Sequence, residues 1–501
     1  MKTVPEVRVR VLARREARPE RDYVLYWSSA YRRTRSNFAL QRAVEHARAL
    51  DRPLVVLDAL RAGYPHASDR FHAFVLAAIA DNAAAYGARG VQHYAYVEPE
   101  VGAGRGLVAA LAARAAIVVT DEFPCGFHPR MQEAAAKALD VRLEIVDSCG
   151  LLPLEAADSD YPTEFAFRRF LQKTLPQHLG EAPLAEPLDG LTGGAARTAQ
   201  IDASIERRFP RASAQLLAAE PAELARLPID HGVAPAELRG GETAARARLA
   251  DVLARRLVDY DERRNEPDAE GSSGLSPYLH FGMLSTHQAF AALAAREEWT
   301  PAKLSPKASG SREGWWGMIR PAEAFLDQVV TWRELGFNFC SKRRDYDRYE
   351  SLPLWARQTL EEHAADPRPR TYTQEQMERS ETHDPLWNAA QRELASTGRM
   401  HNYLRMLWGK KILEWSVSPR EALATMLFLN DKYALDGRDP NTVSGVFWCL
   451  GRYDRPWGPE RPIFGKIRYM SSDNTARKHS VDGYLARFGP RARVDRPTLF
   501  P

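Results

Sequence analysis

Five short apolar segments mark the first 150 residues, and Ala-rich segments of helical character, such as SNFALQRAVEHARAL, lie between them. Strands that alternate with helices at this spacing usually pair in parallel, because each helix carries the chain back across the sheet. The sequence therefore predicts an α/β doubly wound parallel sheet in the N-terminal domain. The strands are expected at residues 22–27, 53–60, 91–97, 116–124 and 141–148.

The pattern changes after this region. A Pro- and Gly-rich stretch, GEAPLAEPLDGLTGGAART, begins at Gly180 and is typical of a linker. From about Ala203 helical periodicity dominates and strand-like runs are scarce. We therefore expect an α/β domain over residues 1–150, an interdomain linker over 151–205 and an all-α domain over 206–501.

The composition indicates a globular protein, with 45% hydrophobic and 27% charged residues in 501. No apolar run reaches the roughly 18 residues of a membrane helix, and the first residues lack the apolar core of a secretory signal. The four cysteines lie far apart, without metal-ligand spacing. We expect a cytoplasmic protein with reduced thiols, no membrane partner and no metal.

The C-terminal end is basic, with eight Lys or Arg against three Asp between Phe464 and Pro501. Tyr469, Tyr484 and Phe488 are interleaved with these cations. Such a pattern is compatible with binding a phosphate backbone, and equally with a solvated tail. The cations are Lys466, Arg468, Arg477, Lys478, Arg487, Arg491, Arg493 and Arg496.

Between Thr382 and Asp439 the sequence gathers indole side chains beside polar groups. Trp408 and Trp415 are seven residues apart among good helix formers, so they share one helix face. A buried aromatic row beside an Arg–Asp pair suits a redox cofactor, whereas a helical core that uses Trp as filler is the alternative. The side chains concerned are Trp387, Trp408, Trp415, Arg405, Asn430 and Asp436.

A Ser-rich segment enters a predicted helix within SSGLSPYLHFGMLSTHQAFAALAA, which starts at Ser272. Its hydroxyl and amide groups would suit an anion, and simple capping of the helix is the other interpretation.

Strings from this segment onward resemble class II cyclobutane pyrimidine dimer photolyases, within the photolyase/cryptochrome superfamily. They extend from Ser272 to Met470, and YWSSAYRRTRSNFAL, from Tyr26, is similar to the family's first strand and helix. The resemblance implies that the all-α domain binds FAD. The strings are SSGLSPYLHFG, FLDQVVTWRELGFNFC, THDPLWNAAQ, GRMHNYLRMLWGKKILEW, LNDKYALDGRDPN and ERPIFGKIRYM.

This resemblance implies a light-dependent repair enzyme acting on UV-damaged DNA. In the family, excited reduced FAD gives an electron to a flipped-out pyrimidine dimer, the cyclobutane ring splits, and the electron returns. A deazaflavin or folate antenna in the α/β domain and a monomeric protein are also implied. A cryptochrome-like FAD photoreceptor with weak or no repair activity is the alternative.

The resemblance also assigns roles to residues around the cofactor. Arg405 and Asp436 resemble the ion pair beside the isoalloxazine ring, and Asn430 resembles the amide that faces flavin N5. Trp408, Trp387 and Trp415 resemble the tryptophans that relay electrons during photoreduction. The residues that resemble flavin phosphate-binding elements are Tyr260, Ser272, Ser273, Gly274, Leu275 and Ser276.

Further residues resemble the family's lesion and DNA contacts. These are Trp332 and Trp448 as aromatic walls of the dimer pocket, Met406 as a further contact, and Asp454 and Arg455 as residues that fill the gap in the duplex. The segment between Trp448 and Asp454 is one residue shorter than the usual family pattern.

One departure from the family falls at the lesion. Where a Glu-Glu pair commonly follows Phe-Leu, this chain has Asp327 and Gln328. Gln328 takes the position of the glutamate that contacts the dimer bases, and an amide donates and accepts hydrogen bonds but does not titrate. Adjacent helical residues point about 100° apart, which argues against compensation by Asp327.

Overall fold

The computed structural model describes residues 2–490 and consists of two compact units. The domain boundaries expected near residues 150 and 205 stay a prediction. The first unit comprises the chain up to Arg255, Gly274–Arg344 and Arg438–Asn441. The second comprises Arg256–Ser273, Asp345–Gly437 and the chain from Thr442 onward.

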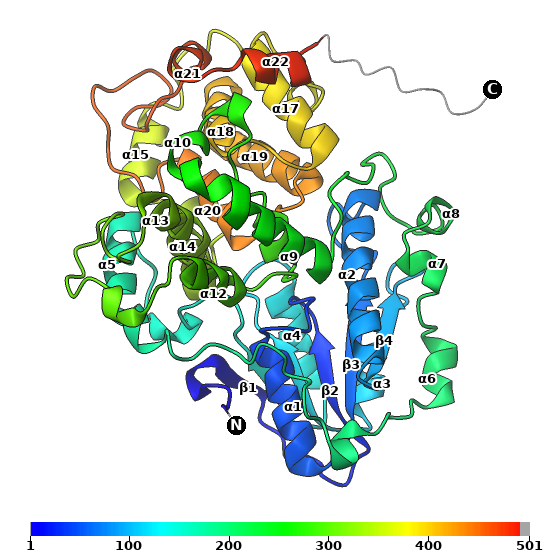
Figure 1. The fold of residues 1–501 in the computed structure, drawn as a ribbon. Helices are drawn as coiled ribbons and strands as arrows, with labels where there is room; N and C mark the ends of the chain where they lie inside the picture. The colour runs from blue at the N-terminus through cyan, green and yellow to red at the C-terminus, as the bar shows by residue number, and fades with distance from the viewer. Residues whose placement is uncertain (1, 491–501) are drawn as a thin grey trace. The chain divides into compact units, whose positions relative to one another are not determined.

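The first unit contains a six-stranded sheet with the order β1-β6-β5-β2-β3-β4. Figure 1 labels its strands β1, β2, β3 and β4. The five predicted strands are present and pair in parallel, so the predicted fold class is confirmed. An additional edge strand, β1, pairs antiparallel with β6. The strands are β1 (Val9–Ala13), β2 (Tyr23–Ser28), β3 (Leu54–Leu60), β4 (Gln92–Val97), β5 (Ala115–Asp121) and β6 (Leu143–Val146).

Both faces of the sheet are buried, as expected for a doubly wound fold. Alternate residues of β2 enter opposite cores: Leu25 and Trp27 pack in one core, and Val24 and Tyr26 pack in the other. Helices α3 and α4 cover the first core and α1 covers the second. The helices are α1 (Phe38–Leu50), α2 (Asp69–Gly87), α3 (Leu107–Ala112) and α4 (His128–Ala138).

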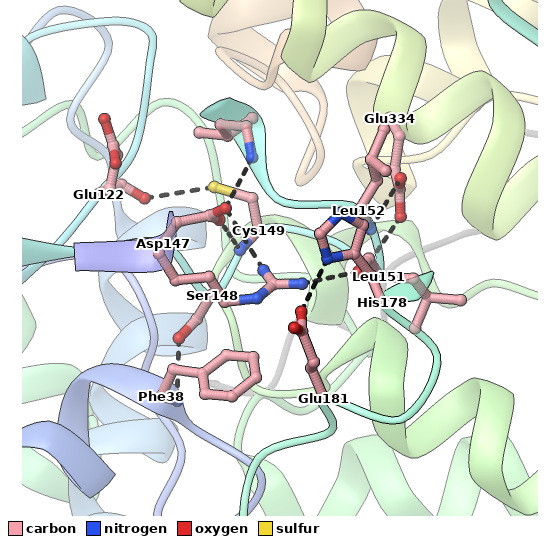
Figure 2. A network of polar contacts seen from close by, with 12 residues as sticks. Phe38, Glu122, Asp147, Ser148, Cys149, Leu151, Leu152, His178, Glu181 and Glu334 are labelled. Atoms are coloured by element: carbon pink, nitrogen blue, oxygen red, sulfur yellow. Dashed lines mark hydrogen bonds and ion pairs between the residues drawn. The ribbon is translucent and has the colours of Figure 1, made fainter. Parts of the chain in front are cut away.

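A buried carboxylate ties the segment after β6 to helix α14 (Arg333–Lys342) in the same unit. Glu334 accepts hydrogen bonds from the amides of Leu151 at 2.6 Å and Leu152 at 3.2 Å (Figure 2). A side chain at Gly150 would meet this carboxylate, so glycine leaves it room. Burial raises the pKa of Glu334 to about 7, although both amide bonds oppose that rise.

The rest of the described chain is helical, and no described strand follows β6, as the sequence predicts. None of the helices within residues 2–490 has the length and apolarity to span a membrane. In the first unit these helices are α5 (Glu164–Thr174), α6 (Ala203–Arg208), α7 (Ala214–Leu217), α8 (Pro221–Leu224), α9 (Glu242–Asp251), α11 (Ser276–His280), α12 (Thr286–Arg296), α13 (Arg320–Leu326) and α14.

The second unit is built from helices alone among its regular elements. They are α10 (Tyr260–Arg263), α15 (Leu354–Glu362), α16 (Gln374–Glu378), α17 (Pro385–Thr397), α18 (Asn402–Trp415), α19 (Pro419–Tyr433), most of α20 (Pro440–Cys449), α21 (Ser472–Lys478) and α22 (Asp482–Phe488).

Candidate functional site

Three tryptophans of the second unit form a contiguous row. The ring centroids of Trp387 and Trp408 lie 6.5 Å apart with their planes 3° from parallel. Those of Trp387 and Trp415 lie 5.4 Å apart with the planes at 70°. The order in space is therefore Trp408, Trp387, Trp415, so the row crosses from α18 to α17 and back.

A helical hairpin and two buried hydrogen bonds hold this row. Gly398 ends α17 in the left-handed conformation, and α18 begins four residues later, so the two helices pack closely. The indole N–H of Trp387 donates to the carbonyl of Trp408 at 3.0 Å, and that of Trp408 donates to Oε1 of Gln391 at 2.9 Å. All three indoles are at most 3% exposed, so they form part of the core as well as a row.

Three residues that contact the row were not identified from the sequence: Gln391, Tyr372 and His383. The ring of Tyr372 lies 5.4 Å from that of Trp415, and its hydroxyl lies 2.9 Å from Nδ1 of His383. His383 is itself 5.4 Å from Trp415 by ring centroids. Gln391 follows Trp387 by four residues, so the two side chains share one helix face. This spacing could have identified Gln391 from the sequence. Tyr372 lies in an irregular segment, where no periodic pattern predicts the neighbours of a side chain.

An ion pair lies one helical turn from the row. Arg405, on α18, donates to Oδ1 of Asp436 through both terminal guanidinium nitrogens, at 3.3 and 3.2 Å. Their side chains are 20% and 17% exposed, so both are accessible to a ligand. Asn430, on α19, is buried and donates to its neighbour Asp431 at a long 3.4 Å. Arg405 and Asp436 are therefore in contact, as expected from the sequence for an Arg–Asp pair.

The predicted phosphate-binding residues divide between the units. Tyr260, Ser272 and Ser273 belong to the second unit, where Oγ of Ser272 accepts from Arg399 at 3.4 Å. Gly274, Leu275 and Ser276 belong to the first, and Gly274 is left-handed at φ 66°.

The Ser-rich segment that begins at Ser272 enters two helices, α11 and α12. In the described structure, α11 starts after Leu275 without a side-chain cap, whereas Ser285 and Gln288 form a capping box at α12. Capping by a hydroxyl of the Ser-rich segment is therefore present, at Ser285.

Gln328 and Trp332 lie in the first unit on a single π-helical segment, Asp327–Trp332. Segments of this kind widen a helix locally and are frequent at functional sites. Asp327 is paired with the buried Arg168 of α5, whose nitrogens lie 3.1 Å from Oδ1. The Asp327 carboxylate is thus committed to Arg168 and does not replace the charge missing at Gln328.

The other predicted lesion contacts lie in the second unit. Trp448 is half-buried near the end of α20, with Nζ of Lys410 4.8 Å from its ring centroid. Oδ1 of Asp454 accepts from the indole of Trp457 and from the amide of Arg455, both at 2.9 Å.

Met406 and the basic end complete the predicted contacts. The carbonyl of Met406 lies 4.0 Å from Sγ of Cys449, and Met406 precedes Trp408 by two residues on α18. Within the basic end, Arg468 stacks on Trp457 at 5.0 Å. Arg491, Arg493 and Arg496 lie outside the described residues.

No protein-family model matches the chain. Solved structures with the same fold include a class III photolyase from Agrobacterium tumefaciens, with a TM-score of 0.65 and 18% identity over 93% of this chain and 86% of that one. A cryptochrome from Synechocystis gives a TM-score of 0.64 and 16% identity over 97% and 89%. The chain therefore shares its fold with these two proteins.

Relatives with higher sequence identity show the family to which the chain belongs. The deoxyribodipyrimidine photo-lyase of Methanothermobacter thermautotrophicus is 34% identical over 480 residues, which are 96% of this chain and 97% of the relative. That of Arabidopsis thaliana is 36% identical over 375 residues, 74% and 69% of the two chains. The chain therefore belongs to the deoxyribodipyrimidine photo-lyase family, and the expected enzyme class is confirmed.

Proposed function

We propose that this enzyme is a class II photolyase, which uses light and reduced FAD to split cyclobutane pyrimidine dimers in DNA. The row Trp408, Trp387, Trp415, in contact on two packed helices one turn from the Arg405–Asp436 pair, is the observation that carries this proposal. The sequence strings from Ser272 to Met470 and the names of the curated relatives support the substrate class.

The residues of the second unit suit the redox ring of FAD. A flavin ring edge carries both carbonyl acceptors and an N–H donor, and Arg405 with Asp436 supplies donors and an acceptor 3.2 Å apart. The Asn430 amide, whose present bond is a long 3.4 Å, can serve as donor or acceptor. When bound in its reduced form, FAD supplies the electron that splits the dimer.

The tryptophan row maintains that reduced form in this proposal. Each indole gives an electron to its neighbour on the cofactor side and is re-reduced from the other side. An external reductant restores Trp415 at the end. Ring contacts of 5.4 and 6.5 Å divide one long transfer into short steps.

The lesion side relies on aromatic surface and hydrogen bonding. Trp332 and Trp448 offer ring faces that replace the stacking an extruded dimer loses. Gln328 orients the bases through its amide, without moving a proton. Asp454 and Arg455, with Met406 as a further contact, would fill and flank the gap in the duplex.

A second, antenna chromophore suits the first unit. Ligands of doubly wound folds bind at the carboxyl edge of the sheet. Within residues 2–490, Oδ1 of Asp58 in β3 and Oδ1 of Asn82 in α2 are buried without a hydrogen bond. These polar atoms suit a deazaflavin or a folate, and comparing the extracted chromophore with both standards decides between them.

The alternative is a cryptochrome-like FAD photoreceptor with weak or no repair activity. Gln328 favours it, because the chain lacks the titratable group that the family commonly places at the dimer. Both functions share the fold and the tryptophan row, so only activity on damaged DNA separates them.

The test uses the purified full chain, an oligonucleotide with one thymine dimer, a reductant and blue light. The proposal predicts a yellow protein that splits the dimer into two intact thymines under light and leaves the dimer unchanged in the dark. A yellow protein without light-dependent repair would favour the photoreceptor, and a colourless protein that takes up no FAD would exclude both.

A further inference from the structure

Lys410 is a lysine with no solvent exposure in the middle of α18. Its Nζ donates to the carbonyl of Cys449, the last residue of α20, at 2.7 Å. The same atom lies 4.8 Å from the ring centroid of Trp448. One ammonium therefore contacts two consecutive residues at the end of one helix.

The contact is possible because α18 and α20 pack closely there. Gly409 precedes Lys410, and a side chain at Gly409 would collide with Sγ of Cys449. The glycine thus lets α20 approach α18, and Lys410 bonds to the carbonyl that ends α20.

A buried ammonium costs more free energy than an apolar group in the same space. Removing an ammonium from water costs several kcal/mol. Within residues 2–490, no carboxylate comes within 4 Å of Nζ. Packing alone would be served as well by methionine, so the ammonium requires another explanation.

The charged and titratable neighbours leave this ammonium poorly compensated. Burial, the largest effect, lowers the pKa of Lys410 to about 8; Arg468 also disfavours the ammonium, and Asp454 favours it. The pKa of the Cys449 thiol is raised to about 11 by its own burial, so this thiol stays neutral at pH 8.

We propose that Lys410 is a positioning residue for the lesion pocket, whose ammonium fixes the indole of Trp448 through its ring face and through the carbonyl of Cys449. The inference rests on the proposed function, in which Trp448 is one aromatic wall for the dimer. A cation on a desolvated ring holds that ring more firmly than an apolar neighbour does. Arg468 also lies over this ring, at 5.8 Å from its centroid, so loss of the Lys410 charge removes the nearer of two cations. Binding of the dimer should then weaken more than binding of undamaged DNA.

The test measures Kd for a dimer-containing oligonucleotide and for its undamaged counterpart, with wild type, Lys410→Met and Lys411→Met. Lys411 is the matched control because it is the next residue of α18, also buried, and pairs with Glu414 at 2.8 Å. At pH 7 Lys410→Met should lose about tenfold of the preference for the dimer, the size of a desolvated cation–π contact.

The pH dependence separates positioning from packing. The wild-type preference for the dimer should fall as pH rises from 7 to 9, because the ammonium is lost near pH 8. Lys410→Met should show no such change, and Lys411→Met should follow the wild type.

An unchanged preference in Lys410→Met, or a wild-type preference that does not vary between pH 7 and 9, would overturn the inference alone. A wild type with no preference for the dimer at any pH and no light-dependent repair would overturn the proposed function as well.

Discussion

The tryptophan row and the proposed lesion contacts are built in different ways. Trp387, Trp408 and Trp415 come from two consecutive helices of one unit, and their indoles touch. Gln328 and Trp332 come from a π-helical segment of the other unit, which a buried ion pair from Arg168 secures. Neighbouring helices order the first region, and long-range contacts order the second.

This difference determines how each region should respond to substitution. In the row, a change at one indole interrupts transfer along a fixed path but leaves the surrounding helices packed. Around Gln328, a change in the supporting residues alters the segment itself. The row should therefore lose its activity without losing its fold, whereas the π-helical segment should lose stability first.

The largest effect is expected for Trp408→Phe, because phenylalanine is much harder to oxidise than an indole. Photoreduction should be abolished, while repair by enzyme reduced chemically with dithionite should persist. The measurement is flavin absorbance under blue light. Trp299→Phe is the matched control, since it also removes one indole hydrogen bond, that to the carbonyl of Trp316 at 2.6 Å. Equal loss of photoreduction and repair would mean that Trp408 does not act as a relay.

Next in size is Arg168→Met, which leaves the Asp327 carboxylate buried and unpaired. Breaking such a pair costs about 3–5 kcal/mol, measured as the free energy of unfolding in urea. Arg21→Met, which removes a pair with the exposed Asp140, should cost only about 0–1 kcal/mol. A similar cost for both variants would show that the ion pair does not support the π-helical segment.

The next effect is expected for Glu334 on helix α14, which directly follows the π-helical segment. Because burial holds its pKa at about 7, above the ordinary 4.5, the folded protein retains a proton that the unfolded chain releases. Stability should therefore fall as pH rises from about 4.5 to 7, by at most about 3 kcal/mol. Glu334→Gln should remove this slope in urea unfolding followed across pH. A slope unchanged in the variant would assign it to another group.

The smallest effect is expected for Gln328→Glu, which restores the family's usual carboxyl group. The yield of repair per absorbed photon should rise by less than about tenfold, equivalent to 1.4 kcal/mol, with photoreduction unchanged. Gln328→Met, which removes the amide, should lower the yield. A higher yield in Gln328→Met than in wild type would show that the amide makes no useful contact.

Local patterns predicted most of the fold. Short apolar segments separated by Ala-rich helical segments predicted β2 to β6, and the seven-residue spacing of Trp408 and Trp415 predicted that both lie on one helix. Strand β1 was missed because its alternation of Val with Arg10 is that of an exposed edge.

Contacts across long sequence separations were not predictable. The pairs Arg168–Asp327 and Lys410–Cys449 join residues 159 and 39 positions apart, and no periodicity relates them. The roles around the flavin and the lesion came from resemblance rather than from spacing, because identical side chains also occur in ordinary cores.

Light-dependent repair of a single thymine dimer by the wild-type chain tests the central claim most directly. The account predicts that blue light and reductant restore the intact strand, that darkness does not, and that the preference for dimer over undamaged DNA is higher at pH 7 than at pH 9. A FAD-loaded, photoreducible protein that leaves the dimer intact under light would contradict it.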